Sequence, residues 1–555
     1  MITFIKPLLT LGLVLFFAIS CSDDSDMGGG DKNESIIEII PAPDAGGTAG
    51  AVMPYVRYDS EEAELAGGAK LNSSPDFDRT NIASQASRQT YIALPTTGSY
   101  AEWVVATEGD GVTMRFTMPD SPDGYGLDGS LDIYVNDSKA TTVELTSYYM
   151  WQYFKHNQNN ASEIPGDEFD MKCFAFDEVH FRLPSSLKAG DRIRVQNSGD
   201  GGLEYGVDFL EIEPVPAPIS APSNSIICAD GDINAAIATA KEQGMNIVYL
   251  PEGTWTYNSP IIISESNVKI TGAGIWHTNI KFTSSERGGG GIIGNCSGVE
   301  LCHMYINSNL RSRYNQDAQY KCFSGYWGRG SVIHDVWEEH FECGFWIADY
   351  VNYKATDYMK IINCRLRNNL ADGLNFCLGT SYSTVYNCSV RNNGDDGLAM
   401  WNYDYRVNKD EYANVFCYNT IEFNWRAGCI AIYGGDRHWI YNNYMCDTYL
   451  AAGIHLNGYF DGFRFGNTVL ILFENNTLVR CGSKADIFGT RHYALSVEDN
   501  HPRNVAFRNT TFYGSQAGDV RIMGDNVTIS GSNFPSSEPL SPAIGTIQIE
   551  YKIPE

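Results

Sequence analysis

The chain has 555 residues, with 39 Lys and Arg against 67 Asp and Glu, so its formal net charge is −28. So acidic a chain argues against a nucleic-acid-binding protein, which needs a basic face to meet phosphates, and against a polyanionic substrate. Aromatic residues make up 12% of the chain, and aromatic faces often hold neutral sugars, so a neutral partner fits the composition best.

Residues 1–20 are predicted to be a lipoprotein signal peptide. Lys6 precedes an apolar run from Leu8 to Ile19, which is too short for a typical membrane-spanning helix, and small residues lie directly before Cys21. This end resembles a bacterial lipobox, which implies cleavage before Cys21 and lipid on that residue. The alternative is a plain signal peptide with an incidental cysteine. The resemblance implies an outer-membrane lipoprotein of a Gram-negative bacterium, at the cell surface or in the periplasm, held to the membrane by its lipid alone. Residues 21–50 predict a flexible tether.

Residues 51–213 predict a β-sandwich. Short alternating runs at 112–116, 131–135 and 191–195 are separated by turn-forming residues, a pattern typical of antiparallel sandwiches. The start and end of this region resemble carbohydrate-binding modules of families 6 and 35, in which acidic residues hold a structural calcium ion. The resemblance implies that Glu62, Glu64 and Asp208 are calcium ligands, and Ca²⁺ does prefer oxygen donors. The alternative is a set of surface acids.

A proline-rich linker at 214–225 leads into a second body, residues 226–555, with a repeating pattern. One helix is predicted from Ile233 to Gly244. Short strand signatures that contain Asn then recur at intervals of 24, 32, 23, 33 and 34 residues, anchored on Asn363, Asn387, Asn419, Asn442, Asn475 and Asn509. A unit of 23–24 residues with insertions is typical of a β-solenoid. We therefore expect an all-β chain, in which the sandwich is followed by a β-helix resembling the right-handed parallel pectate-lyase type. The Asn residues should form stacked ladders at the turns, and the cysteines beyond Cys21 should be buried thiols.

Three carboxylates are predicted to meet on one face of the solenoid. Asp372 and Asp396 are 24 residues apart, which equals the length of the coil, and Asp395 is adjacent. Their backbones should lie ~4.8 Å apart, the spacing of neighbouring strands. Like charges so close raise at least one pKa, which supplies a proton donor beside a base. The alternatives are a calcium site and turn-capping aspartates.

The same residues carry a family resemblance. The runs 337–346, 372–375 and 393–397 resemble glycoside hydrolase family 87, whose members include α-1,3-glucanases and mycodextranases. The resemblance implies that the chain hydrolyses a neutral α-glucan without a catalytic cofactor, and that α-1,3-glucan is the expected substrate. An Asp one coil before an Asp-Asp pair also recurs in β-helical polygalacturonases and dextranases, which invert. By that analogy Asp395 is the general acid, and Asp372 and Asp396 orient and deprotonate water. The polygalacturonases add a Gly-His-Gly where this chain has Ala427-Gly428-Cys429.

Aromatic residues near the acids are candidates for sugar binding. Trp401 and Tyr403 lie in a segment expected to wall the cleft, and Trp346 and His340 sit one coil earlier. Packing is the alternative for each of them. Two other functions stay open: a β-helical polysaccharide lyase, with Arg406 or Arg426 as base, and a glycan-binding surface protein without activity. In every case we expect a monomer with a polysaccharide partner.

Overall fold

The computed structural model describes residues 49–532, except 76, 314–319, 402–412, 459–463, 467–469 and 499–501, together with the backbone of 548–550. These residues all belong to one compact unit, 42–555. The predicted signal peptide with Cys21 lies outside the described residues. Among the helices of the described part, none is long and apolar enough to cross a membrane.

Residues 56–213 form two packed antiparallel sheets and a small hairpin. The first sheet holds β1 (Val56–Asp59), β3 (Lys70–Ser73), β4 (Thr90–Leu94), β6 (Gly109–Thr117), β11 (Asp177–Leu187) and β13 (Tyr205–Glu213). The second holds β2 (Glu64–Ala66), β5 (Tyr100–Val104), β7 (Asp128–Val135), β8 (Ser138–Thr146) and β12 (Arg192–Asn197), and the hairpin is β9 (Gln152–Phe154) with β10 (Met171–Cys173). Short 3-10 turns lie at Ser60–Glu62, Ile82–Gln85, Ser87–Gln89 and Asp200–Gly202. Alternate residues such as Trp103, Ile133 and Val195 are fully or almost fully buried between the sheets, as period-2 patterning requires.

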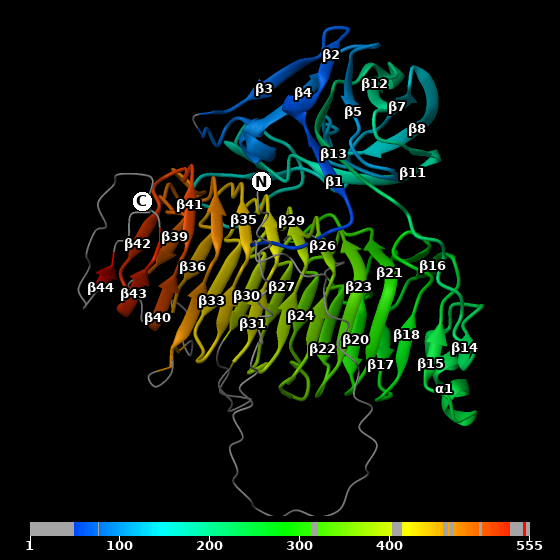
Figure 1. The fold of residues 1–555 in the computed structure, drawn as a ribbon, viewed down its shortest axis with the longest axis vertical. Coiled ribbons are helices and arrows are strands. Elements are labelled where there is room, and N and C mark those ends of the chain that lie inside the picture. The colour runs from blue at the N-terminus through cyan, green and yellow to red at the C-terminus, as the bar shows by residue number, and fades with distance from the viewer. Residues whose placement is uncertain are drawn as a thin grey trace, which may run out of the picture. The chain divides into compact units, whose positions relative to one another are not determined.

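The second body is a solenoid of parallel strands with a helix near its start, α1 (Ile233–Glu242) (Figure 1). In the described part, the longer sheet contains β14 (Ser225–Ile227), β15 (Ile247–Tyr249), β16 (Gly253–Tyr257), β18 (Lys269–Thr271), β19 (Thr278–Phe282), β21 (Glu300–Ser308), β23 (Val332–Glu339), β25 (Lys360–Ile362), β26 (Arg365–Arg367), β28 (Thr384–Tyr386), β29 (Ser389–Arg391), β31 (Val415–Cys417), β32 (Thr420–Glu422), β34 (Trp439–Tyr441), β35 (Tyr444–Cys446), β37 (Ile471–Glu474), β38 (Thr477–Val479), β40 (Arg503–Arg508), β41 (Thr511–Tyr513), β43 (Asp525–Ser530) and β44 (Gln548–Glu550). The other sheet contains β17 (Ile261–Ile263), β20 (Ile292–Asn295), β22 (Phe323–Tyr326), β24 (Phe345–Ile347), β27 (Leu374–Phe376), β30 (Leu398–Trp401), β33 (Ile430–Tyr433), β36 (Ile454–Leu456), β39 (Leu495–Val497) and β42 (Val520–Ile522). The expected fold class, an all-β chain with a sandwich followed by a parallel β-helix, is confirmed.

Asparagine ladders mark the corners of the solenoid. Asn363 and Asn387 both have a positive φ, and Asn387 Nδ2 donates to the side-chain oxygen Oδ1 of Asn363 at 2.8 Å. Asn419 belongs instead to a second, buried ladder, in which its amide donates to Asn443 at 3.0 Å. The repeat anchored on Asn419 was therefore one residue out of register, although the prediction of stacked turns is correct. The cysteines of the described residues are all buried, as expected.

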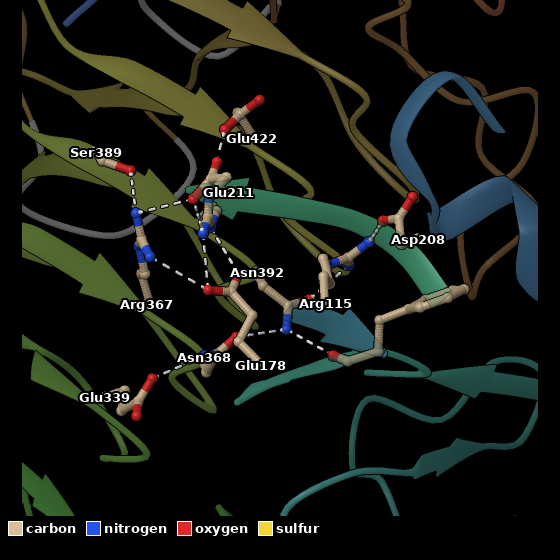
Figure 2. Close-up of polar contacts among 12 residues, drawn as sticks. Arg115, Glu178, Asp208, Glu211, Glu339, Arg367, Asn368, Ser389, Asn392 and Glu422 are labelled. Atoms are coloured by element: carbon tan, nitrogen blue, oxygen red, sulfur yellow. Dashed lines mark hydrogen bonds and ion pairs between the residues drawn. The ribbon is translucent and has the colours of Figure 1, made fainter. Parts of the chain in front are cut away.

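Buried ion pairs join the sandwich to the solenoid (Figure 2). Arg391 of β29 contacts Glu178 of β11 at 2.6 Å and Glu211 of β13 at 2.7 Å, and all three side chains are at most 1% exposed. Arg367 of β26 contacts Glu178 at 3.3 Å, and Arg57 of β1 contacts Glu422 of β32 at 2.6 Å. Charges this deeply buried must be paired, so the network fixes the two parts against each other.

Candidate active site

Asp372, Asp395 and Asp396 come together at the start of two neighbouring strands. Asp372 lies just before β27 and the other two just before β30, and these strands pair in register. One carboxylate oxygen from each of the three lies within 4.8 Å of the others. Asp372 and Asp396 are 4% and 2% exposed, whereas the Asp395 side chain is 21% exposed. Asp395 is thus the member of the cluster that a bound molecule can reach.

The glycine after each of the two stacked aspartates allows this close approach. A Cβ at Gly373 would lie 2.6 Å from the Gly397 carbonyl oxygen, and a Cβ at Gly397 would lie 2.6 Å from the Cys429 carbonyl oxygen. Real Cβ atoms do not approach so closely, so each coil needs glycine at this position. The repeated Asp-Gly pair therefore has a packing cause as well as a chemical one.

Two arginines hold Asp395 in its charged form. Its Oδ2 contacts Arg313 Nη1 at 2.6 Å and Arg426 Nη1 at 3.1 Å. Although burial acts against them, these two guanidinium groups lower the pKa of Asp395 below its ordinary value. Asp395 is ionised near neutral pH in this structure, a state that a general acid must leave before it can donate.

The pKa values of Asp396 and Asp372 are raised, in contrast to that of Asp395. Burial, with the charge of Asp395, raises the pKa of Asp396 to about 7, although Tyr433 Oη donates to its Oδ2 at 2.7 Å and Gly428 N to its Oδ1 at 3.0 Å. Burial first, and then Asp395 and Asp396, raise the pKa of Asp372 well above its usual range. Three carboxyl groups face two guanidinium groups, so one retained proton makes the cluster neutral.

Two of the predicted aromatic residues lie on the sheet face that carries the acids. The register places Trp346, Asn375 and Ala399 in one row across β24, β27 and β30, and Asn375 Nδ2 donates to Asp372 Oδ1 at 3.4 Å. The ring of Trp346 meets that of Trp401 edge-to-face at 5.3 Å, and both are half-buried. Tyr403 lies outside the described residues.

The expectation that His340 lines the sugar site needs correction. Its ring stacks on Tyr149 of the sandwich at 3.8 Å, and its Nε2 contacts Asp177 at 3.0 Å. His340 is 7% exposed. The contact between sandwich and solenoid accounts for its position, which the sequence of the solenoid alone does not indicate.

The residues expected to bind calcium are not brought together. Asp208 is fully buried, where its carboxylate pairs with Arg115 and accepts from Ser87 N at 3.0 Å. The side chain of Glu64 is 72% exposed and pairs with Arg192 instead. Neither Glu62 nor Glu64 belongs to a cluster with metal-ligand spacing among the described residues. A guanidinium group thus stands where the resemblance implied a metal ion. Among the described residues, the clusters with metal-ligand spacing are the aspartates above and Cys302, His303 and His334.

The sequence pattern does not predict several of the residues that surround the three aspartates. Tyr433 pairs in register with Trp401, so alignment of consecutive coils could have found it. Arg426 is predicted from the sequence only as a candidate base of a lyase. Arg313 carries no repeat signal, and neither does Asn159 of the sandwich, whose Oδ1 accepts from Arg426 Nη2 at 2.8 Å. Arg313 and Asn159 are brought to the site by contacts between parts of the chain that are distant in the sequence.

Comparisons with known proteins agree on one family. The family model described as α-1,3-glucanase catalytic domain D1 matches residues 52–215, and the one described as α-1,3-glucanase catalytic domain D2 matches residues 225–532. The expected likeness of the sandwich to carbohydrate-binding modules is not confirmed, since that region matches domain D1. A comparison with curated proteins found none that matches.

Solved structures with the same fold cover most of the chain. The Agl-KA catalytic domain is 43% identical, with a TM-score of 0.81 and coverage of 87% of each chain. The catalytic unit of a thermostable GH87 α-1,3-glucanase from Streptomyces thermodiastaticus strain HF3-3 is 25% identical, with a TM-score of 0.73 and coverage of 87% of each chain. A GH87 α-1,3-glucanase variant in complex with tetrasaccharides is 21% identical, with a TM-score of 0.79, and covers 90% of this chain and 94% of its own. Three aspartate-to-alanine variants in complex with nigerose or tetrasaccharides also match. The second of their replaced aspartates lies 23 positions after the first, and the third directly follows the second.

Proposed function

Because this chain belongs to the α-1,3-glucanase catalytic-domain family, glycoside hydrolase family 87, we propose that it cleaves α-1,3-glucan by inversion with Asp372, Asp395 and Asp396. The observation that carries the proposal is the cluster itself: three carboxyl groups within 4.8 Å, beside two arginines. The spacing from Asp372 to Asp395 and Asp396 equals that of the aspartates replaced in the oligosaccharide complexes.

Asp395 is the proposed proton donor because it is the accessible carboxyl group. Before sugar binds, the retained proton lies on Asp372 or Asp396. A sugar ring that covers Asp395 removes water from it, which disfavours its charged form, and the proposal requires that the proton then move to Asp395. Asp372 and Asp396 are then left ionised, which is the state that a water-activating base requires. One proton transfer thus prepares both the acid and the base.

Retention is the competing mechanism, and one distance favours it. Carboxyl oxygens within 4.8 Å are closer to the roughly 5–5.5 Å of retaining enzymes than to the roughly 6.5–9.5 Å of inverting ones. Asp395 would then be the nucleophile and Asp396 the acid. Hydrogen bonds to both oxygens of Asp396, and its burial, support inversion with a fixed water instead.

Proton NMR during the first minutes of hydrolysis separates the two mechanisms. Inversion of an α-linked glucan releases the β-anomer first, whereas early α-anomer would reassign Asp395 as nucleophile. Reducing-sugar release should be greatest on α-1,3-glucan among purified glucans with different linkages. An ultraviolet band of unsaturated products would instead indicate a lyase.

We also propose that Cys21 carries lipid and anchors the chain to the outer membrane of a Gram-negative bacterium. The support is the apolar run that ends at small residues before Cys21. Fractionation of cells that produce the full chain tests the proposal. The wild-type protein should be found with membranes and Cys21→Ser in the soluble fraction, and equal partition of the two would refute it.

A further inference from the structure

The first coils of the solenoid depart from the ladder pattern at one corner. Asn363 and Asn387 occupy this corner with positive φ, and in the two preceding coils the same place is taken by His303 and Asp335, also with positive φ. The residues just before them, Cys302 and His334, are partners in the register of β21 and β23. Side chains that commonly bind metals therefore replace the structural amide at this corner.

The side chains at this corner converge. One ligand atom from each of Cys302, His303 and His334 lies within 4.8 Å of the others. Glu300 Oε1 lies 3.1 Å from His334 Nε2 and 3.9 Å from Cys302 Sγ, and Lys269 holds the same carboxylate at 2.6 Å. Cys302 and His334 are buried and His303 is half-buried.

His334 is oriented as metal-binding histidines are. Its Nδ1 contacts Asp335 Oδ2 at 2.6 Å, while its Nε2 faces Glu300. A carboxylate on one ring nitrogen fixes the tautomer, so that the other nitrogen presents its lone pair to a metal ion. His303 and Asp335 also line a cavity, which gives an ion a route to the cluster.

We propose that Cys302, His303, His334 and Glu300 form a zinc site, which is separate from the active site. One thiolate, two imidazoles and a carboxylate are ligands that tetrahedral zinc accepts, with bonds of about 2.0–2.3 Å. Such a tetrahedron has edges of roughly 3.3–3.7 Å, so the separations of 3.1 and 3.9 Å from Glu300 need only small side-chain movements. The ion would join β21 to β23, two successive coils, and stabilise the start of the solenoid.

Cobalt is a spectroscopic probe for the site. The full-length protein, freed of metal with a chelator, is titrated with Co²⁺ and then with Zn²⁺. We expect one Co²⁺ per chain with the intense visible bands of a tetrahedral ion and a thiolate-to-cobalt charge-transfer band, and Zn²⁺ should abolish both. A weak octahedral spectrum without charge transfer would place the ion on carboxylates, and would overturn the proposal.

Variants test which cysteine thiol binds the cobalt ion and gives the charge-transfer band. Cys302→Ser should lose the charge-transfer band, whereas Cys417→Ser should keep it. Cys417 is the matched control, because it occupies the same register position four coils later and is not part of the cluster. Equal bands in the two variants would refute the assignment. Should Cys302→Ser fail to fold, His303→Asn provides the test, since Asn is the ladder's own residue at this backbone conformation. It should keep the circular dichroism of the wild type but lose the rise in melting temperature that zinc gives the wild type, and an undiminished rise would count against the site.

Asp335 tests the orientation of His334 independently. Asp335→Asn keeps the shape of the side chain but loses its charge, and should weaken Co²⁺ binding about 10–100-fold, as removal of an outer-shell carboxylate does elsewhere. An unchanged dissociation constant would remove Asp335 from the proposed site.

Discussion

Replacement of Asp395 by Asn should separate proton donation from water activation. With α-1,3-glucan as substrate, Asp395→Asn should lower kcat about 10²–10⁴-fold, the usual contribution of a general acid. With an α-glucosyl fluoride substrate, whose fluoride leaves without protonation, the loss should be far smaller. Steady-state kinetics on both substrates measure the difference.

The other two aspartates provide the matched comparison for that measurement. Asp372→Asn and Asp396→Asn should lose activity on both substrates, because water activation is needed whatever group leaves. If Asp396→Asn were rescued by the fluoride while Asp395→Asn was not, Asp396 would be the acid and Asp395 the nucleophile, as in the retaining mechanism.

The shifted pKa of Asp396 also affects stability. Burial raises this pKa to about 7, so between about pH 4 and pH 7 the folded chain keeps a proton that the unfolded chain has lost. The contribution of Asp396 to the free energy of unfolding therefore falls as pH rises through this range, and stays constant above it. Asn does not titrate, so Asp396→Asn should become more stable relative to the wild type at pH 8 than at pH 5, by about 1–3 kcal/mol.

Melting temperatures of the two proteins at pH 5 and pH 8 measure this effect. The hydrogen bond that Tyr433 gives to Asp396 favours the ionised carboxylate, and its effect is already contained in the pKa of about 7. A difference between wild type and variant that did not depend on pH would show that Asp396 titrates normally.

The sequence predicts these three aspartates because the coil repeats them, but it does not predict their protonation. Asp372 and Asp396 repeat over 24 residues, and that interval alone stacks them. The charge state of Asp395 depends on Arg313 and Arg426, which reach it from other coils. A repeat shows which backbones stack, whereas the pKa of a buried carboxyl depends on every charge around it.

At the scale of strands, buried ion pairs couple the stability of the sandwich to that of the solenoid. A flexible linker between independent modules would not do so. Arg391→Met would remove from Glu178 and Glu211 the nearest of their buried cations and leave only Arg367 and Arg57 beside them. Removal of one partner of a buried ion pair costs about 3–5 kcal/mol, because the remaining charge has no solvent. We expect a loss of that size in the free energy of unfolding, measured by urea denaturation followed by circular dichroism.

Arg182→Met is the matched control for this change. Arg182 pairs with Asp110 at 2.7 Å, but its side chain is 48% exposed, so the same substitution should cost less than about 1 kcal/mol. Equal losses in the two variants would mean that the interface ion pairs contribute no more than surface ones.

Predictions succeeded where they rested on a local pattern, and failed where the environment of a residue depends on partners that are distant in the sequence. Alternating runs predicted the sandwich, and the 23–24 residue unit predicted the solenoid. Asp208 was expected to hold calcium and His340 to hold sugar, yet Arg115 and Tyr149 contact them instead. Both partners are far away in sequence, so neither hydrophobic period nor motif spacing reveals them.

At the scale of the whole molecule, the sandwich has an apolar core of its own, but part of it packs into the core of the solenoid. One buried cluster contains Phe154 and Phe174 of the sandwich region together with core residues of the solenoid such as Trp425. The ring of Phe174 stacks on that of Trp425 at 5.9 Å. Separation of the parts would therefore expose apolar surface on both, besides breaking the ion pairs, and burial of such surface is the main stabilising contribution to folding.

We therefore expect sandwich and solenoid to unfold together. Calorimetry of the full chain should show a single transition, and amides of β6 and β29 should lose protection from hydrogen exchange at the same temperature. The reason is mutual dependence: once the sandwich opens, Arg367 and Arg391 lose their carboxylate partners, and the solenoid loses the aromatic side chains that cover it. Arg391→Met should lower the temperature of the whole transition. Two resolved transitions in the wild type, with β6 exchanging well before β29, would show instead that the sandwich is an independent module resting on the enzyme.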